Sequence, residues 1–289
     1  MARYKHEVAA INIRIPADKN RNYVALIEFI ESLQRSVRVY GSSHLAISFY
    51  DPKENIGIIS KFDEIESDGD WFDLETFDKA RPNDLIAALA ANTLRPNHHR
   101  FYFTLDEELH VIAVSTYGGS KPLSLNLIEK YFRAAFRWKD VVEKFGNVEA
   151  DIVKDHAGVR KLLELPHIRE ISITIRPPNP DDVGPALAAI MEKRLHKQHA
   201  SEYTEKWVAA PKASLDLDQE TKALGEVAAD NGEVTVKNVE DGLVVSYTTD
   251  DMPLKEQAKF KDPSELGMFR VLAIKILEKI AVAREAGKA

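Results

Sequence analysis

Apolar positions along the chain predict short strands alternating with amphipathic helices. Residues 8–15 alternate between apolar and other side chains, with the period of two of a strand. In residues 22–37 the apolar side chains recur every three or four positions, which predicts a helix with one buried face. Paired β-rich runs separated by turn residues predict three hairpins: 45–50 with 56–62, 100–104 with 109–115, and 234–248.

The rest of the chain continues this pattern. Further helices are predicted at 85–90, 122–138, 158–165, 181–197, 220–229 and 264–286, and further strands at 148–153, 168–176 and 203–209. Hairpins outnumber crossover units, which predicts an α+β fold of antiparallel sheets with packed helices and a long C-terminal helix. A break at Gly146 suggests two α+β halves, 1–146 and 147–289, although both halves could also share one core.

Composition narrows the class of protein. The hydrophobic residues make up 44% and the charged residues 29% of 289 residues, as in ordinary globular proteins. The absence of Cys excludes disulfide scaffolds, iron–sulfur clusters, zinc ribbons and thiol nucleophiles. The first residues lack an apolar run of signal-peptide length, and no run approaches a membrane span, so we expect a cytoplasmic protein without membrane insertion.

The distribution of charge matters more than its total. The net charge of −7 argues against a nucleic-acid partner. Residues 45–93, however, hold 11 acidic and four basic side chains, so this segment alone carries a charge of −7. We interpret its acidic stretch, which lacks the spacing of a calcium loop, as a solvated rim. The remainder is neutral on balance, which leaves room for a basic face elsewhere.

Strong catalytic motifs are missing from the sequence. It has no Walker A loop, dinucleotide fingerprint, H-E-x-x-H or G-x-S-x-G pattern, so we expect no catalytic residues and no cofactor. The segment Gly118–Pro122 could hold an anion before a helix, since small residues let backbone N–H groups approach it. A tight turn from strand to helix is the favoured interpretation of this segment.

Two sequence patterns have the spacing of metal-binding residues. His196 and His199 have the spacing of a metal pair, but the neighbouring cations would repel a metal ion, which favours a solvated basic helix end. The string from Asp216 to Lys222 contains the E-x-K of some metal-dependent nucleases. It opens a predicted helix instead of lying on a strand, so its acids are expected to complement the helix dipole. No metal is therefore expected.

Basic clusters give the best functional signal. Lys130, Arg133 and Arg137 are spaced by three and four residues, which places them on one face of the helix predicted after Pro122. A second cluster joins Arg176 to the end of the helix at 181–197. Cations on a rigid helix can contact the phosphates of a nucleic acid. The alternative interpretation is that these cations lie on solvated helix faces and pair with nearby acidic side chains. The candidate DNA-binding residues are Lys121, Lys130, Arg133, Arg137, Lys193, Arg194 and Lys197.

Several segments carry a resemblance to a known family. The run from Phe101-Tyr102-Phe103 through residues 111–118 to Leu123-Ser124, followed by residues 171–177 and the C-terminal helix, resembles RexA-like phage-exclusion proteins and their bacterial relatives. The helix after Pro122 is longer than that family leads us to expect. The resemblance implies an α+β homodimer that binds double-stranded DNA with little sequence preference and acts in anti-phage defence. It does not single out binding residues.

The sequence thus predicts a cytoplasmic, non-enzymatic DNA-binding protein, a sensor or regulator of a defence system, with a second defence-system protein as a further partner. A homodimer is expected because the helix from Pro122 to Trp138 carries more apolar side chains than one buried face needs. Two alternatives stay open. One is a metal-dependent nuclease effector, and the other is a protein-binding adaptor without DNA affinity.

Overall fold

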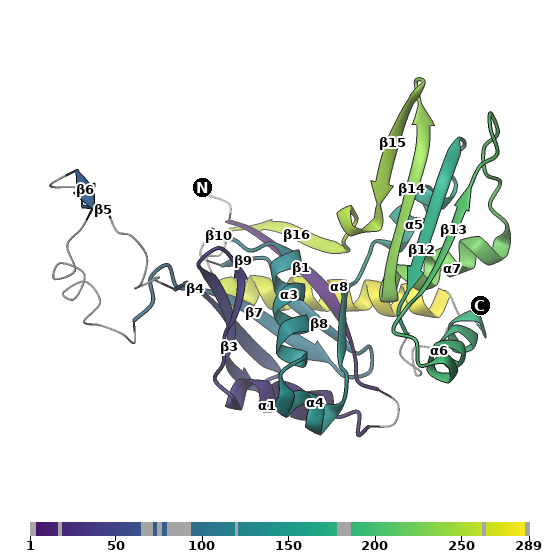
Figure 1. Ribbon diagram of the computed structural model, residues 1–289. Helices are drawn as coiled ribbons and strands as arrows, with labels where there is room; N and C mark the ends of the chain where they lie inside the picture. Colours follow the sequence, from purple (N-terminus) through teal and green to yellow (C-terminus); the bar gives the residue numbers. More distant parts are fainter. Residues whose placement is uncertain are drawn as a thin grey trace.

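The computed structural model describes residues 4–16, 19–64, 72–73, 77–79, 94–118, 121–177, 186–261 and 264–286 (Figure 1). These residues form an eight-stranded and a four-stranded antiparallel sheet, both packed with helices, and two short strand pairs. The pairs are β5 (Phe72–Asp73) with β6 (Asp78–Lys79), and β9 (Tyr117–Gly118) with β10 (Lys121–Pro122). The predicted α+β class with antiparallel sheets is confirmed.

The larger sheet has the order β11-β1-β8-β7-β4-β3-β2, and β16 also pairs with β1. Its strands are β1 (Tyr4–Arg14), β2 (Val37–Tyr40), β3 (Ser43–Asp51), β4 (Ile56–Asp63), β7 (His99–Asp106), β8 (Val111–Ser115), β11 (Glu149–Ile152) and β16 (Lys255–Phe260). Along one edge of β1, β16 pairs with residues 4–9 and β11 with residues 11–14. Strands distant in sequence therefore meet on β1.

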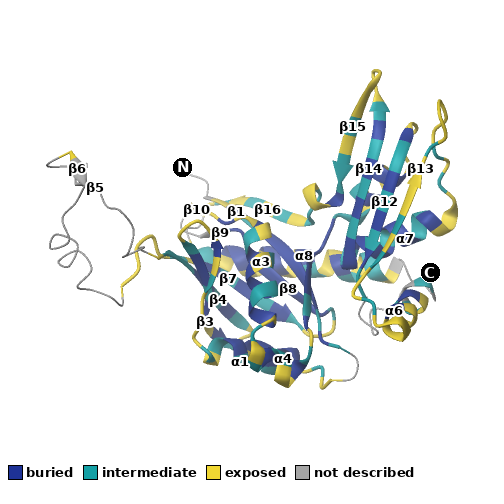
Figure 2. Cartoon of the chain, viewed as in Figure 1, coloured by how far each residue is buried: buried dark blue, intermediate teal, exposed yellow. Residues whose placement is uncertain are grey.

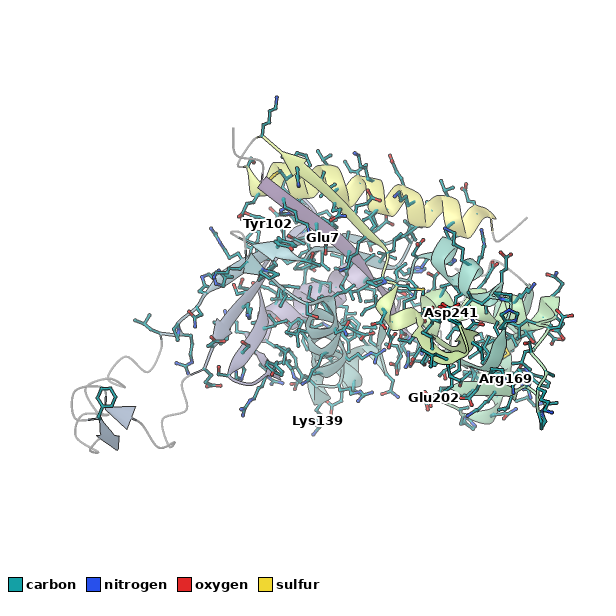
Figure 3. The ribbon with its side chains drawn as sticks, turned by 90° about the horizontal axis from the view of Figure 1, so that it is seen from above. Glu7, Tyr102, Lys139, Arg169, Glu202 and Asp241 are labelled. Atoms are coloured by element: carbon teal, nitrogen blue, oxygen red, sulfur yellow. The ribbon has the colours of Figure 1, made fainter. Side chains whose placement is uncertain are left out.

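Helices cover both faces of this sheet. On one face lie α1 (Tyr23–Ser32), α3 (Leu125–Phe136) and α4 (Lys139–Phe145), and on the other lies α8 (Glu265–Ala286). The alternation of β1 explains this arrangement, because Ile11 joins the first core and Ala10 the second. Figure 3, seen from above, places Lys139 of α4 and helix α8 on opposite sides of the sheet.

The smaller sheet has the order β13-β12-β14-β15. Its elements are β12 (Ile168–Ile175), β13 (Tyr203–Val208), β14 (Gly232–Glu240) and β15 (Leu243–Thr248), with helices α5 (His156–Leu163), α6 (Ala186–Gln198) and α7 (Gln219–Asn231). Alternate residues such as Ile171, Ile173 and Val236 form a separate core with α5 and α7 on one face. The 3-10 helix Thr249–Asp251 (η2) follows β15 and leads back to the larger sheet.

Most predicted elements are confirmed, but several short elements among the described residues were missed, including β2, α4 and β16. The apolar spacing through Val37 predicted helix, but Gln34 adopts a φ of 50° just beyond α1, and the short strand β2 follows. The helix predicted to Trp138 ends at Phe136, and Trp138 is instead the N-cap of a second helix, α4. Strand β16 carries mostly polar side chains, so it lacks the apolar alternation that reveals a strand.

The boundary near Gly146 does not separate the sheets. Strands β11 and β16 and helix α8 all lie beyond residue 146, yet they pair with or pack on the larger sheet. The larger sheet therefore takes strands from both predicted halves, because the chain returns to it at its end. The helix predicted at 85–90, the start of the one predicted at 181–197 and most of the acidic stretch lie outside the described residues.

Helix α8 is the long C-terminal helix that the sequence predicts. Its inner side chains, among them Phe269, Leu272 and Ile276, are buried against the sheet, whereas the opposite side is exposed (Figure 2). Across the part of the chain that the structure describes, no helix is both long and apolar enough to span a membrane.

Candidate nucleic-acid interface

Helix α3 carries the first predicted cluster of cations. It begins after Ser124 and turns Ile128, Phe132 and Phe136 into the main core. These apolar side chains are all buried within the single chain, so α3 has no surplus apolar face to offer a second copy. The apolar side chains that led to the homodimer prediction are therefore accounted for within one chain, because α4 and the sheet cover this helix. The homodimer itself stays a prediction.

Two of the three cations of α3 contact their own chain. Lys130 Nζ donates to the carbonyl oxygen of Val39 at 2.6 Å. Arg133 Nε donates to the carbonyl oxygen of Ala150 at 2.7 Å, and its Nη2 donates to Asp151 Oδ1 at 2.7 Å. Arg137 is exposed at the C-cap. Lys130 is also exposed, so the predicted phosphate-binding face of α3 keeps two surface cations, of which only Arg137 makes no hydrogen bond through its side chain among the described residues.

Asp151 is the centre of a buried ionic cluster. Its side chain is 8% exposed and lies between Arg133 and Arg176, the residue that follows β12. Glu129 Oε1 adds a further contact to Arg133 at 3.0 Å. Although burial lowers the pKa of Arg176, the Asp151 carboxylate raises it above its ordinary value. The cluster links α3, β11 and the end of β12, so it has a structural role.

The second predicted cluster lies on helix α6 and faces solvent. Lys193, Arg194 and Lys197 are all exposed, and none has a carboxylate partner among the described residues. The Arg194 guanidinium carbon lies 5.4 Å from the centroid of the Tyr203 ring, which holds this side chain over β13. The cluster is in the second half of α6, where the carbonyl end of the helix dipole favours cations.

The two motifs considered for metal binding do not form a metal site among the described residues. His196 and His199 are exposed beside the same cations, and no group of three or more His, Asp or Glu residues gathers as metal ligands within the described ranges. Asp218 is the N-cap of α7 and accepts a hydrogen bond from Thr221 N at 2.8 Å, which lowers the pKa of its carboxyl. The E-x-K string therefore starts a helix, as expected.

Lys121 lies in β10, where it pairs with Gly118 and is exposed. A cleft of about 690 Å³ opens beside this hairpin at the start of α3. Three carboxylates, those of Glu7, Asp250 and Asp251, line that cleft together with the ammonium group of Lys255, so the net charge of these groups is negative and opposes an anion. Residues 119–120 of the predicted glycine turn lie outside the described residues.

One ionic centre had no signal in the sequence. Asp230 at the end of α7 lies 3.0 Å from His156 Nε2 and 3.4 Å from Arg284 Nε. The side chain of Asn12 in β1 reaches the neighbouring Asn231 Oδ1 at 3.0 Å. Residues from four distant segments meet here, so no local spacing could have predicted the group, which joins the small sheet to β1 and α8.

Comparison with known proteins gives a family without a known activity. A search of curated proteins finds no match to the chain. A family model described as a domain of unknown function, DUF4747, matches residues 4–277. Because this match covers nearly the whole chain, the protein belongs to the DUF4747 family.

Proposed function

We propose that this protein binds double-stranded DNA through its phosphates, without reading base sequence, and that α6 is the contact element. The observation that carries the proposal is the cluster of Lys193, Arg194 and Lys197, which is exposed and has no carboxylate partner among the described residues. Each cation that neutralises a phosphate releases counterions, so three neighbouring cations give a salt-dependent attraction. Phosphate contacts alone carry no sequence information.

The sequence predicted DNA contacts from both α3 and α6, and only the contacts from α6 are kept in this proposal. Arg133 would have to leave Asp151 in order to contact a phosphate, and Lys130 would have to leave the carbonyl oxygen of Val39. Both moves would break contacts with the chain's own fold. Lys193 and Lys197 have no such contact to give up, and Arg194 would leave only the ring of Tyr203.

The resemblance to RexA-like proteins supports a biological setting for this activity. On that basis the protein acts as a non-enzymatic sensor or regulator of anti-phage defence in the bacterial cytoplasm, together with a second defence-system protein. The two alternative functions, a metal-dependent nuclease effector and a protein-binding adaptor without DNA affinity, predict different results in a DNA-binding experiment.

Binding of a labelled duplex should be measured by fluorescence anisotropy at several salt concentrations between about 50 and 200 mM. The test variant is K193Q/R194Q/K197Q. The control is K53Q/K139Q/K212Q, which removes the same charge from three exposed lysines elsewhere. We expect the α6 variant to weaken binding and to lower the salt slope by about 2 to 3, because each phosphate contact contributes about 0.9. The control should retain the wild-type slope.

Three results would overturn the proposal. Absence of DNA binding at low salt would favour the adaptor, and magnesium-dependent cleavage of plasmid DNA by the purified protein would favour the nuclease. An unchanged affinity of the α6 variant would show that another surface makes the contacts. Unrelated duplexes of equal length should bind equally, since no base edges are read.

A further inference from the structure

The outer side of α8 has an apolar stripe that the fold leaves uncovered. Val271 is 44% exposed, Ile274 59% and Val282 66%. The opposite side of the same helix packs on β1, β8, β7 and β16, so the helix already buries one full face. Figure 3 shows α8 at the margin of the molecule, with the sheet on one side of it only. A second apolar stripe on a sheet-bound helix is typical of an interaction surface.

The charges within this stripe form a self-complementary pattern. Val271, Lys275, Glu278 and Val282 are separated by four, three and four residues, so they follow one line along the helix. Lys275 and Glu278 are exposed, and neither has an ion-pair partner among the described residues. When a second copy of this helix runs in the opposite direction, each apolar residue of the line faces an apolar residue, and each basic residue faces an acidic one.

We propose that α8 pairs antiparallel with α8 of a second copy of the chain, about a two-fold axis between Ile276 and Leu277. In that register Lys275 lies opposite Glu278 of the second copy, and each such contact occurs twice. Val271 lies opposite Val282 at both ends, and Ile274 packs on the aliphatic part of Lys279. A parallel pair would instead place Lys275 opposite Lys275, which is unfavourable.

The size of the stripe sets the strength of the pair. From Val271 to Val282 the helix rises about 17 Å, at about 1.5 Å per residue. Such a patch is smaller than the roughly 800 Å² per partner of a standard stable interface. The dimer is therefore reversible, with a dissociation constant on the order of micromolar. This association does not depend on the proposed DNA affinity, because α6 and α8 are separate surfaces.

Sedimentation velocity of the full chain across about 1 to 100 µM tests the proposal, because this range brackets a micromolar constant. The wild type should pass from the monomer mass of 32.5 kDa to twice that value. The variant V282D should stay monomeric. The control V244D changes a valine of nearly equal exposure, 65%, on β15 and should dimerise like the wild type. Circular dichroism checks that both variants keep their helices.

A charge exchange tests the antiparallel register. K275E and E278K each place like charges opposite one another twice, so each variant alone should dimerise about tenfold more weakly. An equimolar mixture of the two should recover dimers, because every facing pair is then of opposite sign. A wild type that stays monomeric, a V282D variant that still dimerises, or a mixture that gives no recovery would each overturn the proposal.

Discussion

Arg133 of helix α3 and Asp151 of strand β11 form an ion pair, with Arg133 Nη2 2.7 Å from Asp151 Oδ1. The carboxylate is 8% exposed, and it also contacts Arg176. Arg133, which helical spacing had placed on a predicted phosphate-binding face, therefore stabilises the fold through this ion pair. Helical spacing identifies the side of a helix that a residue occupies, but not whether a carboxylate lies across from it.

This pair predicts a difference between neighbouring arginines of α3. R133M should lower the free energy of unfolding by about 2 kcal/mol, because a buried carboxylate loses one of its charged donors. R137M, at the exposed C-cap, should change it by less than about 0.5 kcal/mol. Urea denaturation followed by circular dichroism measures both. Equal effects in the two variants would contradict the structural role of Arg133.

The local elements were largely predictable from the sequence. The buried faces of α1 and α3 follow from the spacing of their apolar residues, and the hairpins β3–β4 and β14–β15 from turn residues between β-rich runs. The sequence therefore predicted that α3 has a buried apolar face. It did not predict which elements cover that face, because the sequence of residues 125–136 carries no information on the packing of α4 and the strands against its aromatic side chains.

The parts that the sequence could not predict depend on long-range pairing. Strand β16 is recognised as a strand only through its backbone hydrogen bonds to β1, about 250 residues earlier, since its side chains are polar. The contacts of Arg133 and Asp230 likewise depend on tertiary placement. The basic cluster of α6 was predictable because exposed cations need no partner, so local composition alone identifies it.

His156 predicts a loss of stability in alkaline solution. Burial alone would lower the pKa of His156, but the Asp230 carboxylate 3.0 Å away raises it above 6.5. A raised pKa in the folded state gives stability that is full below pH 6.5 and is lost as the pH rises through the folded value. The difference in unfolding free energy between wild type and H156Q should therefore shrink between about pH 6 and pH 9. Urea titrations at several pH values test this, and a constant difference would exclude the pair as its cause.

Asp230 predicts the opposite pH dependence. Burial would raise its pKa, but His156 and Arg284 lower it from 3.8 to about 2. This difference corresponds to about 2 kcal/mol, which is present above pH 3.8 and is lost as the pH falls toward 2. D230N should therefore be less stable than wild type by about that amount at pH 5, and the gap should narrow below pH 4. A gap that widens in acid would contradict the assigned cause.

Gly57 predicts a steric coupling inside the main core. A Cβ atom at this position of β4 would lie 2.1 Å from Cζ of Phe103, its partner on β7. The ring of Phe103 is fully buried and stacks on Tyr50 with centroids 5.8 Å apart, so it cannot move aside easily. G57A should therefore lower the free energy of unfolding by about 1 to 3 kcal/mol, as overpacking does.

A double-mutant cycle shows whether the Phe103 ring causes this loss. F103L alone should be destabilising because it leaves a cavity, but it also removes the ring atoms that a Cβ at position 57 would meet. In the F103L background, G57A should cost clearly less than in the wild type, with a coupling energy of about 1 kcal/mol or more. Urea denaturation of the four proteins gives this coupling. If G57A costs the same in both backgrounds, the requirement for glycine at position 57 comes from the backbone of β4 and not from the ring that packs against it.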